Sequence, residues 1–170
     1  MSVTALLSMQ VGVVVERHKA TSPWLDYVWR PAAVLPGVPS AAPWTLLATD
    51  GDKATFYAGP ATIELHRTET GNYIGNLDGD GPLLWVVLRE TGSDPPLKVQ
   101  SVTADPAEGE AYTEAGNDLV ETVPMPAPIA EAVAAFIAEH HVERPFYKRQ
   151  RDRAEPGRPP GARLRGDETS

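Results

Sequence analysis

What the 170-residue chain lacks excludes several classes of protein site. It contains no cysteine, so it has no disulfide, no thiolate metal ligand, no chain-held iron–sulfur cluster and no cysteine nucleophile. No apolar run approaches the roughly 20 residues of a membrane-spanning helix. The first basic residue is Arg17, so the N-terminus lacks the charged region of a secretory signal. We therefore expect a cytoplasmic protein with no membrane partner.

Histidine is also scarce, and the motifs of common catalytic sites are missing. The four histidines are His18, His66, His140 and His141. The last two are adjacent on an expected helix, where neighbouring side chains diverge by about 100° and do not converge on one metal ion. No Gly-x-Ser-x-Gly elbow and no strand–glycine loop–helix phosphate motif is present. The sequence therefore predicts no metal site and no catalytic residues, and it favours a non-enzymatic role.

Basic residues are rare in the first 143 positions and concentrated after them. Residues 1–143 hold seven basic and nineteen acidic side chains, a formal charge of −12, whereas residues 144–165 hold eight basic and two acidic ones. Because an acidic body repels nucleic acid, we expect no nucleic-acid partner. Residues 148–170, rich in arginine, proline and glycine, are predicted to be a disordered basic tail. Such a tail is either a solubilising extension or a docking arm for an acidic partner.

Short alternating and apolar segments between turn signals predict a mainly β fold. The expected strands are residues 9–18, 26–35, 44–49, 53–58, 61–67, 83–89, 97–104 and 118–123. Asp50-Gly51-Asp52 between two apolar runs predicts a hairpin, and the continuous apolar run 83–89 predicts a strand buried on both faces. Residues 68–82, with four glycines, read as a long loop. Residues 105–117 read as a short irregular helix or a loop.

One amphipathic helix is expected at about residues 128–142. Its apolar residues recur at i, i+4, i+7 and i+8, namely Ile129, Val133, Phe136 and Ile137. Pro128 suits a first helical turn, and Pro145 ends the segment. The predicted architecture is one α+β domain over residues 1–147, an antiparallel meander or small barrel of six to eight strands capped by this C-terminal helix. A closed barrel and a helix-covered sheet both fit this pattern.

Aromatic residues cluster in two places. Trp24, Tyr27, Trp29 and Trp44 lie within 21 residues, and the chain after the expected helix combines two aromatic residues with a basic run. Tryptophan often anchors a small core, but tryptophan, tyrosine and arginine also dominate protein–protein hot spots. On the second interpretation, the candidate partner-binding residues are Trp24, Tyr27, Trp29, Arg30, Phe146, Tyr147, Lys148, Arg149 and Arg151.

Seven segments spread along the chain form a distinctive combination. They are residues 9–17, 29–37, 56–59, 63–70, 84–89, 102–110 and 140–153. Together they resemble an uncharacterised proteobacterial family, the domain-of-unknown-function family 3305, over about residues 8–154. In gene order, members of that family look like neighbours of formate dehydrogenases and of their molybdenum-cofactor accessory proteins. The resemblance implies an accessory or assembly protein that docks onto a subunit of a molybdenum-dependent formate dehydrogenase or onto its maturation factor.

Some sequences of this family carry the label molybdopterin-guanine dinucleotide biosynthesis protein A. That label implies an alternative, the transient binding or the biosynthesis of the molybdopterin dinucleotide cofactor. Because the cofactor is anionic, Arg30, Arg67 or Arg89 would have to form its pocket. A transferase role is the least favoured, because residues 13–20 read Val-Val-Val-Glu-Arg-His-Lys-Ala where a glycine-rich nucleotide loop is expected. The residues that would hold a cofactor are not identified by the sequence.

Overall fold

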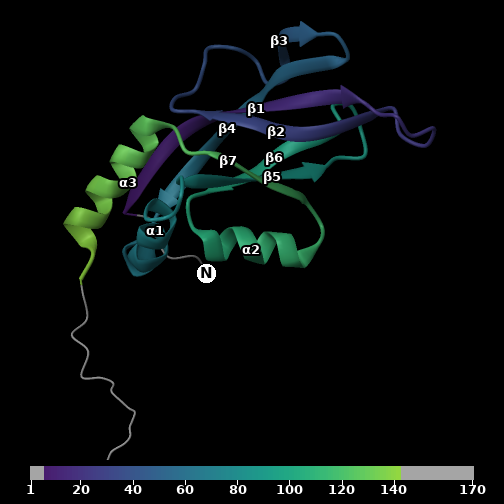
Figure 1. Ribbon diagram of the computed structural model, residues 1–170. Helices are drawn as coiled ribbons and strands as arrows, with labels where there is room; N and C mark the ends of the chain where they lie inside the picture. The colour runs from purple at the N-terminus through teal and green to yellow at the C-terminus, as the bar shows by residue number, and fades with distance from the viewer. Residues whose placement is uncertain (1–5, 143–170) are drawn as a thin grey trace, which may run out of the picture.

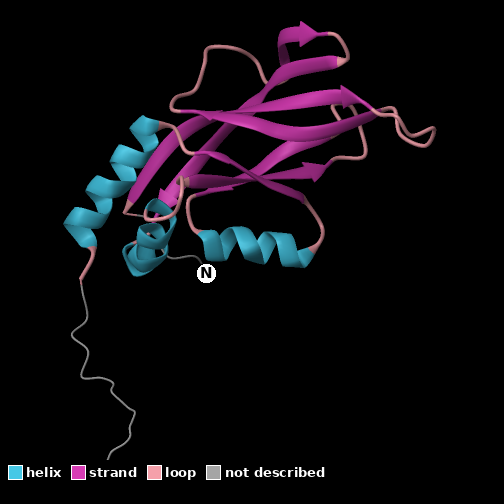
Figure 2. Cartoon of the chain, in the orientation of Figure 1, coloured by secondary structure: helices cyan, strands magenta, loops and turns pink. Residues whose placement is uncertain are grey.

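Two antiparallel sheets and three α-helices make up the computed structural model, which describes residues 6–142 (Figures 1 and 2). The first sheet has the order β2-β1-β4-β3, and the second has the order β6-β5-β7. The strands are β1 (Leu7–Lys19), β2 (Tyr27–Leu35), β3 (Thr45–Asp50), β4 (Lys53–Leu65), β5 (Leu83–Glu90), β6 (Leu97–Thr103) and β7 (Leu119–Pro124). The helices are η1 (Arg67–Glu69), α1 (Thr70–Leu77), α2 (Pro106–Ala115) and α3 (Ala127–His140).

The strand order corrects the predicted meander. β1 pairs with β2 on one side and with β4 on the other, and β5 lies between β6 and β7. The 13-residue strands β1 and β4 pair along most of their length, so this long ladder takes the place of sequential hairpin order. Among the described residues no ladder joins the two sheets, so they form no closed barrel, although β4 lies beside β6 and β2 beside β7.

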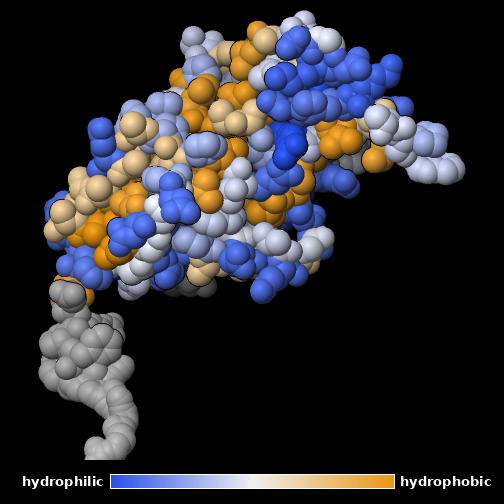
Figure 3. All heavy atoms as spheres, in the orientation of Figure 1, coloured by the Kyte–Doolittle hydropathy of each residue, from blue (hydrophilic) through white to orange (hydrophobic). Residues whose placement is uncertain are grey.

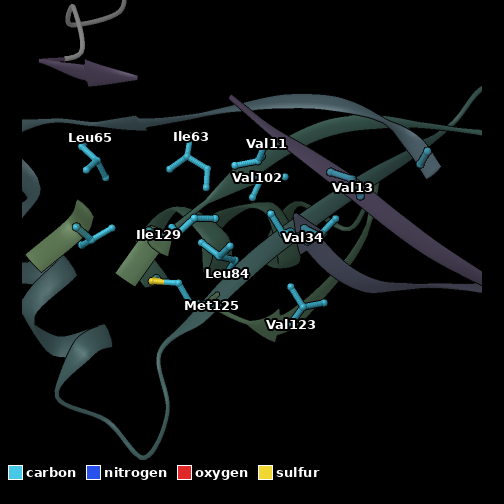
Figure 4. Close-up of a cluster of buried hydrophobic side chains, with 14 of the residues drawn as sticks. Val11, Val13, Val34, Ile63, Leu65, Leu84, Val102, Val123, Met125 and Ile129 are labelled. Atoms are coloured by element: carbon cyan, nitrogen blue, oxygen red, sulfur yellow. The ribbon is translucent and has the colours of Figure 1, made fainter. Parts of the chain in front are cut away.

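The core lies between the two sheets and is capped at one end by α3 (Figures 1 and 4). Alternate residues of β1 point into it, and so do apolar residues of β5. The fully buried members from these two strands are Val11, Val13, Val15, Leu84, Val86 and Leu88. Ile129, Val133 and Phe136 of α3 are buried too, which confirms the predicted apolar face. The helix spans Ala127–His140, close to the expected 128–142.

The prediction of a long loop over residues 68–82 is wrong, because most of this segment forms η1 and α1. Tyr73 is buried, and its hydroxyl oxygen accepts a hydrogen bond from the backbone N–H of His66 at 2.9 Å. The Asn76 amide donates to the carbonyl oxygens of Leu83 and Ala104 and accepts from the N–H of Leu83. These bonds, of which the one to Ala104 spans 28 residues, stabilise a short helix whose two glycines disfavour it locally.

Other local predictions are confirmed. Asp50 pairs with Lys53 across a hairpin, and Gly51 at its tip has a positive φ of 61°. Residues 106–115 are helical: the Asp105 carboxylate accepts a hydrogen bond from the N–H of Ala107, and Gly116 ends the helix in a left-handed conformation. β5 is the central strand of its sheet and is buried on both faces. The predicted tail lies outside the described residues, and no helix within 6–142 is long and apolar enough to cross a bilayer.

Candidate functional site

The inner face of the first sheet continues past the valine core into an aromatic cluster. Arg17 of β1 lies opposite Trp29 of β2, and Val15 lies opposite Phe56 of β4. Because side chains alternate along a strand, Arg17, Trp29 and Phe56 share the face of the buried Val15. The cluster therefore lies at the end of the sheets opposite α1 and α3, near the β1–β2 connection (Figure 1).

Three rings in this cluster pack against one another. The ring centroids of Trp29 and Trp44 are 5.7 Å apart with perpendicular planes, and Phe56 lies 5.8 Å from Trp29 and 6.0 Å from Trp44. These separations lie in the favourable range for edge-to-face and tilted aromatic pairs. Trp44 has a φ of 69°, a left-handed conformation that costs a bulky residue roughly 1–3 kcal/mol. Strain of this kind gathers at functional sites.

Arg17 lies among the rings. Its guanidinium carbon is 4.2 Å from the ring centroid of Tyr27, 5.2 Å from that of Phe56 and 5.8 Å from that of Trp29. Of the described residues, none places a carboxylate oxygen within 4.0 Å of this guanidinium. Its charge is therefore stabilised by aromatic faces rather than by an ion pair.

A cavity of about 530 Å³ opens on this cluster, and we call it the aromatic groove. Its walls are the four aromatic rings and Arg17, together with Asp26 and the β5–β6 turn residues 94–96, which include a cis Asp94–Pro95 peptide. The volume lies within the usual range of ligand sites. Leu25 and Val28, both about half exposed, line a second cavity that shares Tyr27 and Trp29 with the groove. Figure 3 shows hydrophobic surface at this end of the molecule, bordered by hydrophilic surface.

The structure divides the candidate partner-binding residues among different surfaces. Tyr27 and Trp29 line the aromatic groove, whereas Trp24, 88% exposed, lies on the β1–β2 connection three positions before Tyr27 and is not part of the groove wall. Arg30 points to the opposite face of β2, where its Nη2 lies 3.3 Å from a carboxylate oxygen of Glu121. The other five candidates, Phe146, Tyr147, Lys148, Arg149 and Arg151, lie outside the described residues.

Sequence reasoning missed Arg17, Phe56 and residues 94–96 as parts of this site. For Arg17 a signal existed, because it follows Val11, Val13 and Val15 in the same alternation and so shares their face. Phe56 and the turn at 94–96 gave none, because they reach the groove only through the pairing of β4 with β1 and the packing of the second sheet.

The three arginines considered for an anionic cofactor do not form one pocket. Arg89 forms a bidentate salt bridge with Asp118, in which Nε donates to Oδ1 at 2.8 Å and Nη2 donates to Oδ2 at 3.0 Å. This hydrogen bonding raises the pKa of Arg89 and lowers the pKa of Asp118. Arg30 is paired with Glu121, and Arg67 lies exposed on η1.

A third cavity, of about 390 Å³, lies where β4 approaches β6 and has a polar lining that includes Glu64, His66, Glu108 and Tyr112. His66 Nε2 is 3.5 Å from a Glu64 carboxylate oxygen, and its buried Nδ1 has no hydrogen-bond partner among the described residues. Within the same part of the chain, no group of three or more histidines and carboxylates is placed to hold a metal ion.

A sequence model of one protein family, described as a protein of unknown function (DUF3305), matches residues 10–150. The chain belongs to the DUF3305 family. No curated protein and no solved structure is significantly similar to it. This membership confirms the family resemblance carried by the seven sequence segments. Since the family description assigns no activity, the function of this DUF3305 protein has to be argued from its site.

Proposed function

We propose that this DUF3305 protein is a non-enzymatic accessory protein that docks onto a molybdenum-dependent formate dehydrogenase, or onto a factor that matures it. The observation that supports docking is the aromatic groove, in which an arginine packs among three rings at an open end of the fold. Tryptophan, tyrosine and arginine are the residue types that dominate interface hot spots.

The surroundings of the groove favour binding over catalysis. Leu25 and Val28, which line the neighbouring cavity, extend an exposed apolar surface from its rim, and Trp24, next to Leu25 in the chain, is exposed as well. Contiguous apolar surface bordered by polar residues is typical of protein-interaction sites. Of residues 6–142, those lining the groove with ionisable side chains are Arg17, Asp26, Asp94 and Tyr27, and none is a histidine base or a serine or threonine nucleophile.

The choice of partner comes from the family resemblance, whereas the docking surface comes from the geometry. The alternative role, binding the molybdopterin dinucleotide, draws no support from Arg30 and Arg89, because carboxylates already pair with both guanidinium groups. Freeing either arginine for an anion would leave a carboxylate without its partner.

The test measures the binding of purified formate dehydrogenase subunits to the immobilised full chain by interferometry. Trp24→Ala and Tyr27→Ala should each weaken binding by about thirtyfold, the effect of losing roughly 2 kcal/mol at a hot spot. Val38→Ala is the matched control, since Val38 is also half exposed but lies outside the groove. No binding at micromolar concentrations would refute the partner, and full binding by both the Trp24 and the Tyr27 variants would refute the docking surface.

A further inference from the structure

The aromatic groove combines apolar walls with two carboxylates that lack cationic partners. Rings of Tyr27, Trp29, Trp44 and Phe56 face the cavity together with two prolines, and Asp26 and Asp94 line it as well. Among the described residues, neither carboxylate has a nitrogen of lysine, arginine or histidine within 4.0 Å. Arg17 forms no ion pair with them, because its guanidinium packs on the rings, and the three charges leave the groove with a net formal charge of −1.

This combination fits one kind of peptide. Proline-rich segments form a preorganised polyproline II helix, which docks into aromatic-lined grooves at little entropic cost. An arginine beside the prolines would pair with the free carboxylates, and an acidic body attracts a basic segment further. An anionic segment would instead meet Asp26, Asp94 and the surrounding negative charge.

The chain itself carries a segment with this chemistry. Residues 156–163 read Pro-Gly-Arg-Pro-Pro-Gly-Ala-Arg, with three prolines, two arginines and no acid. We infer that this segment binds in the aromatic groove of its own chain. The groove would then be an intramolecular docking site for an arginine-flanked proline-rich peptide.

The length of the chain permits this contact. The groove and α3 lie at opposite ends of the sheets (Figure 1), so the chain must run along most of the length of β1, whose 13 residues span roughly 43 Å at about 3.3 Å per residue. The 14 residues from Val142 to Pro156 reach at most about 50 Å when fully extended. The segment can therefore reach the groove only when most of the linker between Val142 and Pro156 is extended.

A regulatory consequence follows, and it rests on the proposed function. A partner that binds the same groove must first displace residues 156–163. If the segment no longer binds the groove, the groove is free in every molecule. The apparent affinity for the partner should then rise by the inverse of the fraction of molecules whose groove is free in the wild type.

The experiment uses the full chain and the indole N–H resonances of its four tryptophans. In a variant carrying Arg158→Ala, Pro159→Ala and Pro160→Ala, the resonances of Trp29 and Trp44 should shift, whereas that of Trp85, which packs under α2, should not. A peptide of residues 153–165 added to this variant should return the shifted resonances toward their original positions. In the wild-type chain the positions should not depend on protein concentration.

Two matched comparisons separate specific docking from charge attraction. A peptide whose three prolines are replaced by alanine keeps its charge and should bind at least tenfold more weakly. Asp26→Asn, an exposed change in the groove, should weaken the peptide severalfold, whereas Asp80→Asn, exposed in the α1–β5 connection, should leave it unchanged.

Several results would overturn the inference: unshifted Trp29 and Trp44 resonances, equal binding of the alanine peptide, or equal effects of the two aspartate variants. If the resonance positions of the wild-type chain depend on protein concentration, the segment binds the groove of a second copy and the intramolecular contact is refuted. Dehydrogenase binding is read separately. If the dehydrogenase binds and the peptide does not, this inference fails and the proposed function stands; the reverse result rejects only the partner.

Discussion

The packing of α2 on the second sheet depends on a glycine, and this gives a sharp test of the structure. Gly109 is the buried residue of α2, and it lies directly against the indole of Trp85 in β5. A Cβ atom at this position would lie 2.3 Å from Cγ and Cδ1 of Trp85 and 2.8 Å from Cδ2. Cγ is attached to the tryptophan backbone through Cβ alone, and rotation of the ring about the Cβ–Cγ bond leaves Cγ in place. The ring therefore cannot rotate away cheaply, and α2 would have to move.

The expected magnitude for Gly109→Ala follows from two opposing effects. Overpacking costs roughly 1–3 kcal/mol, and a separation of 2.3 Å places this clash in the upper part of that range, while alanine favours a helix interior over glycine by up to about 1 kcal/mol. The variant should therefore lose about 1–2 kcal/mol in its free energy of unfolding. Gly75→Ala is the matched control, because Gly75 also lies inside a helix, α1, and no atom of the described residues lies within 4 Å of its added Cβ. That change should stabilise the protein by roughly 0.5–1 kcal/mol.

Urea unfolding followed by circular dichroism measures both variants. For a domain of this size the slope is about 1–3 kcal/mol per molar urea, and with a slope of about 2, Gly109→Ala should lower the midpoint by roughly 0.5–1 M. The same substitution in two helices is thus expected to have opposite signs. If Gly109→Ala is as stable as the wild type while Gly75→Ala gains stability, the close approach of α2 to Trp85 is refuted.

Two further predictions concern ionisable groups. The pKa of Asp118 is lowered, first by the hydrogen bond from Arg89, so this pair should stabilise the fold at neutral pH and lose its effect as pH falls below about 3.9, the usual value for aspartate. Asp118→Asn should therefore lower the urea midpoint at pH 7 and lower it less in strong acid; an unchanged difference at both pH values would contradict this. Burial raises the pKa of Tyr73 to about 12, so its neutral form stabilises the fold below the ordinary tyrosine pKa and this contribution is lost as pH rises from about 10 toward 12. An absorbance titration should show one tyrosine ionising late; in Tyr73→Phe that step should be missing, and stability should fall by roughly 0.5–1.5 kcal/mol through the lost bond to His66.

Local patterns determined most of the elements because their physical causes are local. Alternating residues 61–67, the apolar run 83–89, the Asp50–Asp52 turn and the spaced apolar residues of α3 each carry their own signal of strand, turn or helix. The seven family segments likewise determined the family, which the match over residues 10–150 confirms. These features need no knowledge of what lies across the core.

Only the tertiary structure decided the strand order, α1 and the aromatic groove. The ladder between β1 and β4 joins segments about 45 residues apart, and no local pattern specifies such pairing. α1 forms in a glycine-rich stretch because Tyr73 and Asn76 find backbone partners outside the helix, and the bond from Asn76 to Ala104 spans 28 residues. The groove needs Arg17, Trp29, Phe56 and the turn at 94–96 together, and their proximity is set by strand register and sheet packing rather than by neighbours in the chain.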